Sequence, residues 1–357
     1  MRLTEPRRGP RSRQALAIIA APALIVGLAT PTTASSASTS ESSDNQTATP
    51  TKKSAPYLSK SVNSSNARMA KLRDYWTPER MANAVPADKL TRQALKRQTA
   101  ASRTRPERVK PSTLANSVAP SGQQDGTTQR RRLRKSKTIG KVFFRTRKGV
   151  DMVCSGAAVN SRRKNMVMTA GHCVNGGRGK GWHKRWIFVP GYGPGRRARH
   201  GIYPATRLVA LRGWIKRSNF NYDVAIALVK PGRGTNKKLV RKVGGYGLQT
   251  GRSYRRKLTA IGYSQLGYKG DKQKKCRRRT HRRPHTRQIA MRCRVLTPGA
   301  SGGPWVKGRI RIKKRSHSYI NGVNSNINRR RHPTRIRSPH FGRAVRKMYR
   351  AYRNKKH

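Results

Sequence analysis

The feature that most constrains the fold is the grouping of apolar residues beyond about residue 139. Short apolar runs alternate there with Gly, Pro and Asn. Several short strands at such spacing predict an all-β barrel or sandwich. The runs cover residues 166–169, 186–189, 224–229, 258–263, 305–306 and 320–323.

The charge of the chain is extreme. It has 84 Lys and Arg residues against 11 Asp and Glu residues, a formal net charge of +73. A net charge of this size far exceeds what solubility requires. The repulsion between so many like charges also opposes compaction of the chain. One interpretation is adhesion to polyanions such as cell-wall polymers or nucleic acid, or steering of acidic substrates. The alternative is a solvated or compositionally biased surface with no binding role.

The N-terminus has the layout of a secretory signal peptide, which we place at residues 1–36. Several arginines precede an apolar run at residues 15–29, and small residues follow it. The run is too short for a good membrane span and is interrupted by Pro22, so a permanent anchor is the weaker alternative. We therefore expect a secreted, extracellular protein with no membrane span after signal removal.

Residues 37–137 predict a propeptide or linker that is largely disordered. The segment is polar and shows one local helix signal, near residues 77–85. There Thr77 can cap a helix, Pro78 suits its first turn, and Trp76 can pack on Met81. The alternative is a freely solvated tail. After the basic run at 130–135, we expect one folded domain over residues 138–357.

The end of the chain predicts a helix that packs on the barrel. Six apolar residues follow the spacing of one helical face. They are Phe341, Ala344, Val345, Met348, Tyr349 and Tyr352.

Four cysteines follow residue 150, and disulfides are the default in an exported chain. Three connectivities are open. Pairing Cys154 with Cys173 and Cys276 with Cys293 is the simplest, because it closes two short loops. The rival interpretation is a metal site at Cys276, His281, His285 and Cys293. We predict no metal, since the arginines between these residues would repel a dication.

The strongest chemical signal is the segment 299–304, Gly-Ala-Ser-Gly-Gly-Pro. A serine flanked by glycines can lie on a turn where backbone N–H groups converge on a developing oxyanion. Ser301 is the candidate nucleophile, and the amides of Gly299 and Ser301 are the candidate oxyanion hole. The alternative for this segment alone is a Gly-rich turn.

Two further motifs supply a base and an acid. His172 ends an apolar strand beside Cys173, whose disulfide would hold the histidine backbone in place. Asp223 opens an apolar strand, and it is one of only three acidic residues after residue 130. A buried carboxylate needs a partner such as an imidazole N–H. The order His172, Asp223, Ser301 matches one known order of the catalytic triad of serine proteases.

Residues 139–353 resemble the trypsin-like secreted serine peptidases of actinobacteria, related to the glutamyl endopeptidase branch of the chymotrypsin superfamily. The resemblance implies a double six-stranded β-barrel with the triad in the cleft between the barrels and no cofactor. The Tyr-Trp-Thr-Pro-Glu-Arg segment at 75–80 is similar to propeptides of that group. The matching motifs begin at Cys154, Thr169, Tyr222, Ala300, Ile320 and Ser338.

The chain departs from related proteins at several positions. Ala300 replaces the aspartate that pairs with a new N-terminus in animal enzymes, so we expect activation by removal of a covering propeptide. No acid stands at 295–297, which argues against Lys or Arg preference. Asn324 stands where glutamyl enzymes have a histidine. We assign Thr297, Asn324 and Ser325 to substrate binding and leave the preferred residue open.

The sequence therefore predicts a monomeric, secreted serine endopeptidase that hydrolyses proteins or peptides through an acyl-enzyme. The alternative is a cationic polyanion-binding protein on a weakly active or inactive protease scaffold. We also expect the surrounding cations to lower the pKa of His172.

Overall fold

The computed structural model describes residues 54–62, 65–88, 106–119, 136–193, 198–265, 270–312, 315–328 and 334–356. All of them belong to one unit, Lys53–His357. The predicted signal peptide lies outside the described residues. None of the helices within these ranges is both long and apolar enough to span a bilayer.

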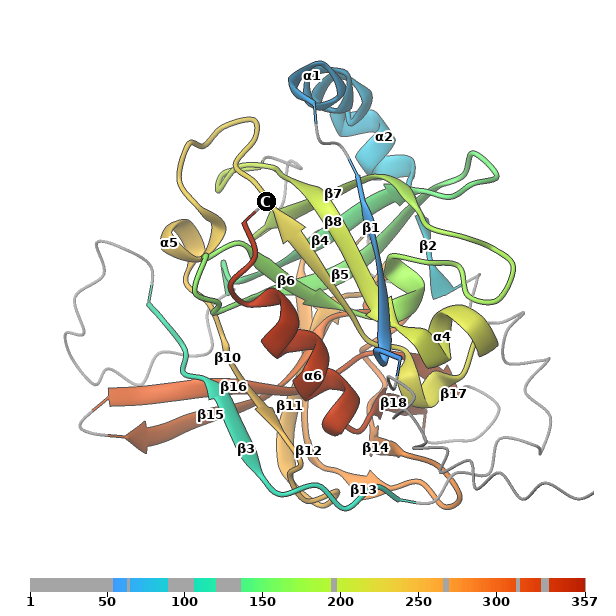
Figure 1. The fold of residues 1–357 in the computed structure, drawn as a ribbon, viewed down its shortest axis with the longest axis vertical. Helices are drawn as coiled ribbons and strands as arrows, with labels where there is room; N and C mark the ends of the chain where they lie inside the picture. The colour runs from blue at the N-terminus through green and yellow to red at the C-terminus, as the bar shows by residue number, and fades with distance from the viewer. Residues whose placement is uncertain are drawn as a thin grey trace, which may run out of the picture. The chain divides into compact units, whose positions relative to one another are not determined.

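Six antiparallel strands form a closed barrel in the first half of this unit (Figure 1). Their order is β8-β7-β4-β5-β6-β9, and pairing between β8 and β9 closes the ring. All five residues of β9 and all four of β6 are buried, which explains their uninterrupted apolar sequences. The strands are β4 (Ile139–Arg145), β5 (Asp151–Val159), β6 (Met166–Thr169), β7 (Lys184–Pro190), β8 (Tyr203–Leu211) and β9 (Ala225–Val229).

The second half forms two further sheets, one of which includes β3 from the N-terminal part of the unit. One has the order β12-β11-β15-β16-β10-β3 and the other β13-β14-β18-β17. The predicted all-β architecture is therefore confirmed. The strands are β3 (Ser112–Ala115), β10 (Gly247–Thr250), β11 (Lys257–Tyr263), β12 (Gln273–Arg279), β13 (His281–Arg282), β14 (Gln288–Arg292), β15 (Pro304–Ile312), β16 (Arg315–Val323), β17 (Asn326–Asn328) and β18 (Arg335–Pro339).

The predicted C-terminal helix is also confirmed, as α6 (Arg343–Tyr352). Val345, Met348 and Tyr349 are buried in the main apolar core. Tyr352 packs at the edge of that core, and its ring meets the Tyr57 ring edge-on at 5.5 Å between centroids. Two shorter helices, α4 (Arg212–Arg217) and α5 (Leu239–Val243), lie in connections between strands.

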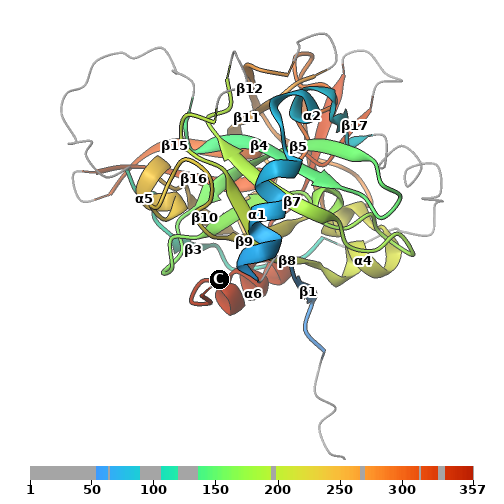
Figure 2. The ribbon, with the colours of Figure 1, turned by 90° about the horizontal axis from the view of Figure 1, so that it is seen from above.

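The described residues before residue 119 form more helices and strands than their sequence predicts. Besides the expected helix, now α2 (Pro78–Asn83) with Thr77 as its cap, they contain α1 (Asn66–Tyr75), β1 (Tyr57–Ser61) and β2 (Val85–Pro86). β1 pairs with β8, β2 with β5, and β3 with β10. Figure 2 shows α1 and α2 lying over the strands of the first barrel. Strands this short are stabilised by the sheet edges they join, so their own sequences carry little signal.

Candidate active site

His172 and Asp223 are brought together by two paired strands of the first barrel. His172 lies in a 3₁₀ turn (Gly171–Cys173) just after β6, and Asp223 lies just before β9. β6 and β9 are antiparallel, with Thr169 opposite Ala225, so the end of one strand adjoins the start of the other. The sequence-predicted pairing of a strand-ending base with a strand-opening acid follows from this register.

Asp223 holds His172 through both carboxylate oxygens. Oδ1 accepts the backbone N–H of His172 at 2.8 Å, and Oδ2 lies 2.9 Å from His172 Nδ1. Both residues are fully buried. Because an ionised carboxylate can only accept, Nδ1 carries the proton and Nε2 faces away as the potential base.

Ser325 is a third partner of this pair. Its hydroxyl donates to Asp223 Oδ2 at 2.6 Å, and it accepts a hydrogen bond from Asn326 Nδ2 at 3.2 Å. Ser325 was predicted from its position in the sequence to bind substrate. Its hydroxyl is instead directed at the acid, where it satisfies a buried charge.

Ser301 lies on a tight turn that requires glycine at both sides. Gly299 and Gly302 have φ of +96° and +81°. A Cβ at Gly302 would lie 2.1 Å from Thr169 Oγ1, so no side chain fits there. Ser155 braces the turn, because its Oγ donates to Gly299 O at 3.0 Å and accepts from Tyr263 N at 2.9 Å.

The carboxylate of Asp88, a residue with no predicted role, accepts two hydrogen bonds from this turn. Asp88 Oδ2 accepts the backbone N–H of Gly299 at 2.9 Å, and Asp88 Oδ1 accepts the Ser301 hydroxyl at 3.0 Å. The Asp88 side chain is buried. Ser301 and one of the two predicted oxyanion donors therefore converge on one anionic group. No sequence signal pointed to Asp88, which is 213 residues away from Ser301.

The pKa of His172 is raised above its ordinary value. Burial acts to lower it, but the charge and hydrogen bond of Asp223 and the charge of Asp88 outweigh burial. The expected lowering by surrounding cations is thus wrong, because the two carboxylates dominate the field at this buried ring. In the described part of the chain, His172 Nε2 is buried with no hydrogen-bond partner.

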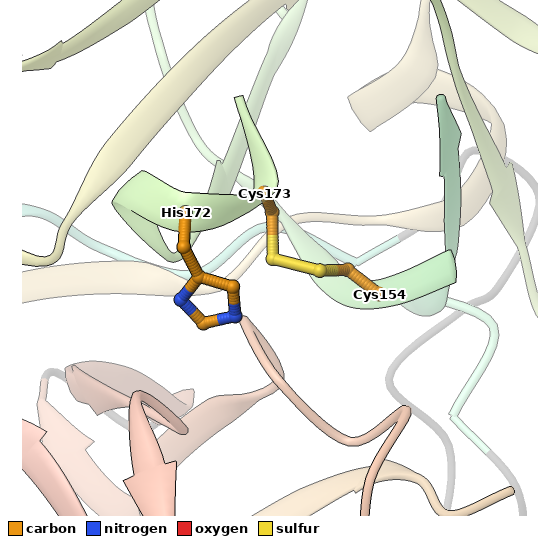
Figure 3. Close-up of side chains that lie close together, drawn as sticks. All are labelled: Cys154, His172 and Cys173. Atoms are coloured by element: carbon orange, nitrogen blue, oxygen red, sulfur yellow. A yellow bond between two sulfur atoms is a disulfide. The ribbon is translucent and has the colours of Figure 1, made fainter. Parts of the chain in front are cut away.

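The predicted disulfides Cys154–Cys173 and Cys276–Cys293 are both present. Figure 3 shows the first beside the His172 ring. His172, Cys154 and Cys173 lie close enough together to suggest a metal site. However, zinc is bound by free thiolates, and these sulfurs are bonded to each other. The rival site at Cys276 and Cys293 loses its thiolates in the same way.

The residues assigned to substrate binding are mostly engaged internally. Asn324 Oδ1 accepts from Trp305 Nε1 at 2.7 Å, and its Nδ2 donates to the carbonyls of Ile261 and Ala300. Asn324 therefore supports the turn that carries Ser301. A cavity of about 10 Å³ adjoins Ser301 and does not include Thr297 in its lining. It is lined by Leu296, Ala300, Ser301, Asn324, Ser325, Asn326, Ile327 and Ile336.

Comparison with known proteins identifies the scaffold. No protein-family model and no curated protein matches the chain. The protease Anisep from Arthrobacter nicotinovorans is 32% identical, with a TM-score of 0.54 over 61% of this chain and 95% of that chain. The thermostable serine protease AL20 from an extremophilic microorganism is 27% identical, with a TM-score of 0.55 over 62% and 99%. A Glu endopeptidase matches at 17% identity and a TM-score of 0.48, over 64% and 97%.

The likenesses to Anisep and AL20 confirm the predicted double β-barrel with a C-terminal helix. They also agree with the resemblance read from the sequence motifs. The chain belongs to the bacterial serine proteases of the chymotrypsin fold.

Proposed function

We propose that the chain is a secreted, monomeric serine endopeptidase with Ser301 as nucleophile, His172 as general base and Asp223 as the acid that orients it. One observation carries the proposal. The Ser301 hydroxyl and the Gly299 amide both donate to a single carboxylate, 3.0 and 2.9 Å away, beside the buried His172–Asp223 pair. A site that holds one anion in this way suits the oxyanion of a tetrahedral intermediate.

The reaction follows from these positions. Ser301 Oγ attacks the scissile carbonyl while His172 Nε2 takes its proton and passes it to the leaving amine. The amides of Gly299 and Ser301 stabilise the oxyanion, and Asp223 stabilises the imidazolium. Water then hydrolyses the acyl-enzyme with His172 again acting as base.

A fluorophosphonate probe tests this assignment. Wild-type protein that has lost residues 1–137 should be labelled covalently, whereas Ser301→Ala should not be labelled at all. Ser161→Ala serves as the matched control, because Ser161 is also buried but bonds to Asn165 rather than to the nucleophile turn. Absence of labelling in the processed wild type would overturn the enzyme assignment.

Maturation and location belong to the same proposal. The signal peptide at 1–36 directs export, and removal of residues 37–137 yields the active form. Two disulfides in the described chain are consistent with an oxidising compartment. N-terminal sequencing of protein from the culture medium should find a start close to residue 138, and size-exclusion chromatography should find one copy.

A specific observation favours polyanion binding as an additional property of the enzyme. The second disulfide lines a hollow of about 540 Å³, and none of the described residues that line this hollow is acidic. We propose that linear polyanions such as cell-wall phosphate polymers bind there through counterion release. The lining residues are Lys275, Cys276, Arg277, Arg278, Arg292, Cys293, Arg294 and Val295.

Inorganic polyphosphate is a suitable probe for this hollow. Arg277→Gln with Arg278→Gln should weaken binding and reduce its salt dependence by about two charges. The exposed Lys347 and Arg350 of α6, both changed to Gln, provide a control of equal charge. Equal losses in both double variants would show that binding is spread over the surface and not directed to this hollow.

A further inference from the structure

The segment that carries Asp88 is fixed to the catalytic unit on both sides of the site. β2 pairs with β5 in parallel, with Pro86 opposite Val153, and Ala87 N donates to Val153 O at 3.0 Å. Gln265, just after β11 of the second sheet system, donates to Ala84 O at 2.9 Å. The chain just before Asp88 is therefore bonded both to β5 of the first barrel and to Gln265 of the second half.

The helices before β2 hold this strand in place. Trp76 is buried and its Nε1 donates to Arg185 O at 2.7 Å. Asp151 of β5 accepts hydrogen bonds from Tyr75 Oη at 2.5 Å and from Arg80 at 2.9 Å. Met81 and Ala84 are buried in the same core as the barrel residues. This packing limits the freedom of the chain leading to Asp88.

We infer that residues 75–88 form an intramolecular inhibitor, in which the Asp88 carboxylate occupies the position of the reaction oxyanion and engages the nucleophile. The inference rests on the proposed peptidase function and specifies its regulation. The propeptide expected from the sequence would thus keep the site inactive through a specific contact, that of Asp88 with Ser301 and Gly299.

The chemistry of a carboxylate suits this role. It is a resonance-stabilised anion and a poor electrophile, so Ser301 cannot be acylated by it. Its Oδ2 accepts a charge-assisted hydrogen bond from the Gly299 amide, one of the two donors that would stabilise the transition state, and its Oδ1 accepts one from the Ser301 hydroxyl, the nucleophile itself. The group presented to Ser301 is thus a side-chain anion and not a peptide carbonyl, and the segment can occupy the site without being cut there.

The same contact also separates the proposed nucleophile, Ser301, from its proposed base, His172. The Ser301 hydroxyl donates to Asp88, while His172 Nε2 has no hydrogen-bond partner within the described residues. Burial lowers the pKa of His172 and Asp223 raises it, and the negative charge of Asp88 adds to that increase. A higher pKa disfavours the neutral imidazole that must accept the Ser301 proton, so the Asp88 contact opposes the reaction in two respects.

Ion pairs also attach the described residues 106–119, which follow the inhibitor segment, to the catalytic unit. The chain has a net charge of +73, so acidic partners for its arginines are few. Glu107 is one such partner, because its carboxylate lies 3.6 Å from Arg287 and 3.8 Å from Arg343 of the catalytic unit. While the segment is covalently attached, its effective concentration at the site is about millimolar. Cleavage between residues 119 and 138 would end this advantage and allow the segment to dissociate.

Fluorophosphonate labelling of the chain from residue 37 onward tests the inference, because unprocessed and processed forms separate by size on one gel. Unprocessed wild type should react slower than processed wild type by about tenfold or more, the effect of losing one charged hydrogen-bonded contact. Unprocessed Asp88→Ala should recover most of that rate. Asp74→Ala, an exposed carboxylate on α1, should behave as wild type.

The outcomes separate the two proposals. Labelling of processed protein together with equally fast labelling of unprocessed wild type would overturn the inhibitor and leave the peptidase assignment standing. Failure of processed protein to react would overturn the peptidase assignment itself. If Asp88→Ala does not fold, as judged by its thermal melt, the isosteric Asp88→Asn replaces it. A folded Asp88→Asn chain that stays as slow as wild type would remove Asp88 from the mechanism.

Discussion

Asp223 accepts the backbone N–H and the imidazole Nδ1–H of His172 on different carboxylate oxygens, at 2.8 and 2.9 Å. The acid therefore fixes both the position and the tautomer of the histidine. The Ser325 hydroxyl completes its coordination at 2.6 Å. Each bond to a fully buried charge has a measurable cost when it is removed.

Ser325→Ala should lower kcat about tenfold with little change in KM, because Asp223 loses a charge-assisted hydrogen bond worth about 1.5–3 kcal/mol. Steady-state kinetics on the processed enzyme provide the measurement. Ser338→Ala is the control, since Ser338 is equally buried but bonds to Val323 N and Pro339 O. Equal losses of kcat in both variants would mean that Ser325 has no special connection to the acid.

Ser155→Ala should loosen the nucleophile turn. The substitution leaves Gly299 O and Tyr263 N without their present side-chain partner, at about 1–3 kcal/mol for each unsatisfied group. We expect weaker binding of a peptide boronate, which resembles the tetrahedral intermediate, and a lower melting temperature. Ser161→Ala should leave boronate affinity unchanged. Unaltered affinity in Ser155→Ala would contradict the bracing role.

His183 makes stability depend on pH. Burial lowers its pKa to about 3, and its Nε2 lies 3.0 Å from His172 O, to which it donates as a neutral ring. Between about pH 6.5 and 3 the unfolded chain binds a proton at this residue that the folded chain does not. Stability is therefore present above pH 6.5 and is lost as the pH falls, by up to about 1.4 kcal/mol per pH unit.

Melting temperatures from pH 7 to pH 4 check the His183 prediction. His183→Gln keeps a donor for His172 O but cannot titrate, so its stability should fall less steeply with acid. His281→Gln is the comparison, because the pKa of His281 is also lowered by burial and by nearby arginines, but this residue is only half-buried. Identical slopes in wild type and His183→Gln would refute the prediction.

The cavity beside Ser301 predicts a substrate preference. Leu296, Ile327 and Ile336 give it apolar walls, and about 10 Å³ admits roughly one water. A charged side chain would be desolvated there without a counter-charge. Peptides with Ala before the cut bond should therefore have a kcat/KM at least about tenfold above those with Lys or Glu.

A series of chromogenic peptides that differ only in this residue measures the preference. Ile327→Ala should enlarge the cavity and shift the preference toward Leu. Fastest cleavage after Lys or Glu would show that another surface selects the side chain.

The sequence by itself determined the features that depend on local pattern. Apolar runs marked the strands, and the spacing from Phe341 to Tyr352 marked α6. The motifs around His172 and Ser301 were recognisable because each requires particular neighbours, a cysteine in one case and glycines in the other. Asp223 was recognisable because so few acids remain in this part of the chain.

Only the tertiary structure decided which groups meet these residues. Asp88 contacts Gly299 across 211 positions of sequence, and Ser325 contacts Asp223 across 102. Neither contact leaves a periodic or compositional trace, because each depends on how separate sheets are placed. Asn324 was assigned to substrate by position alone, whereas its amide bonds to Trp305, Ile261 and Ala300. Local patterns thus specify the elements and the reactive groups, and packing between distant elements specifies their partners.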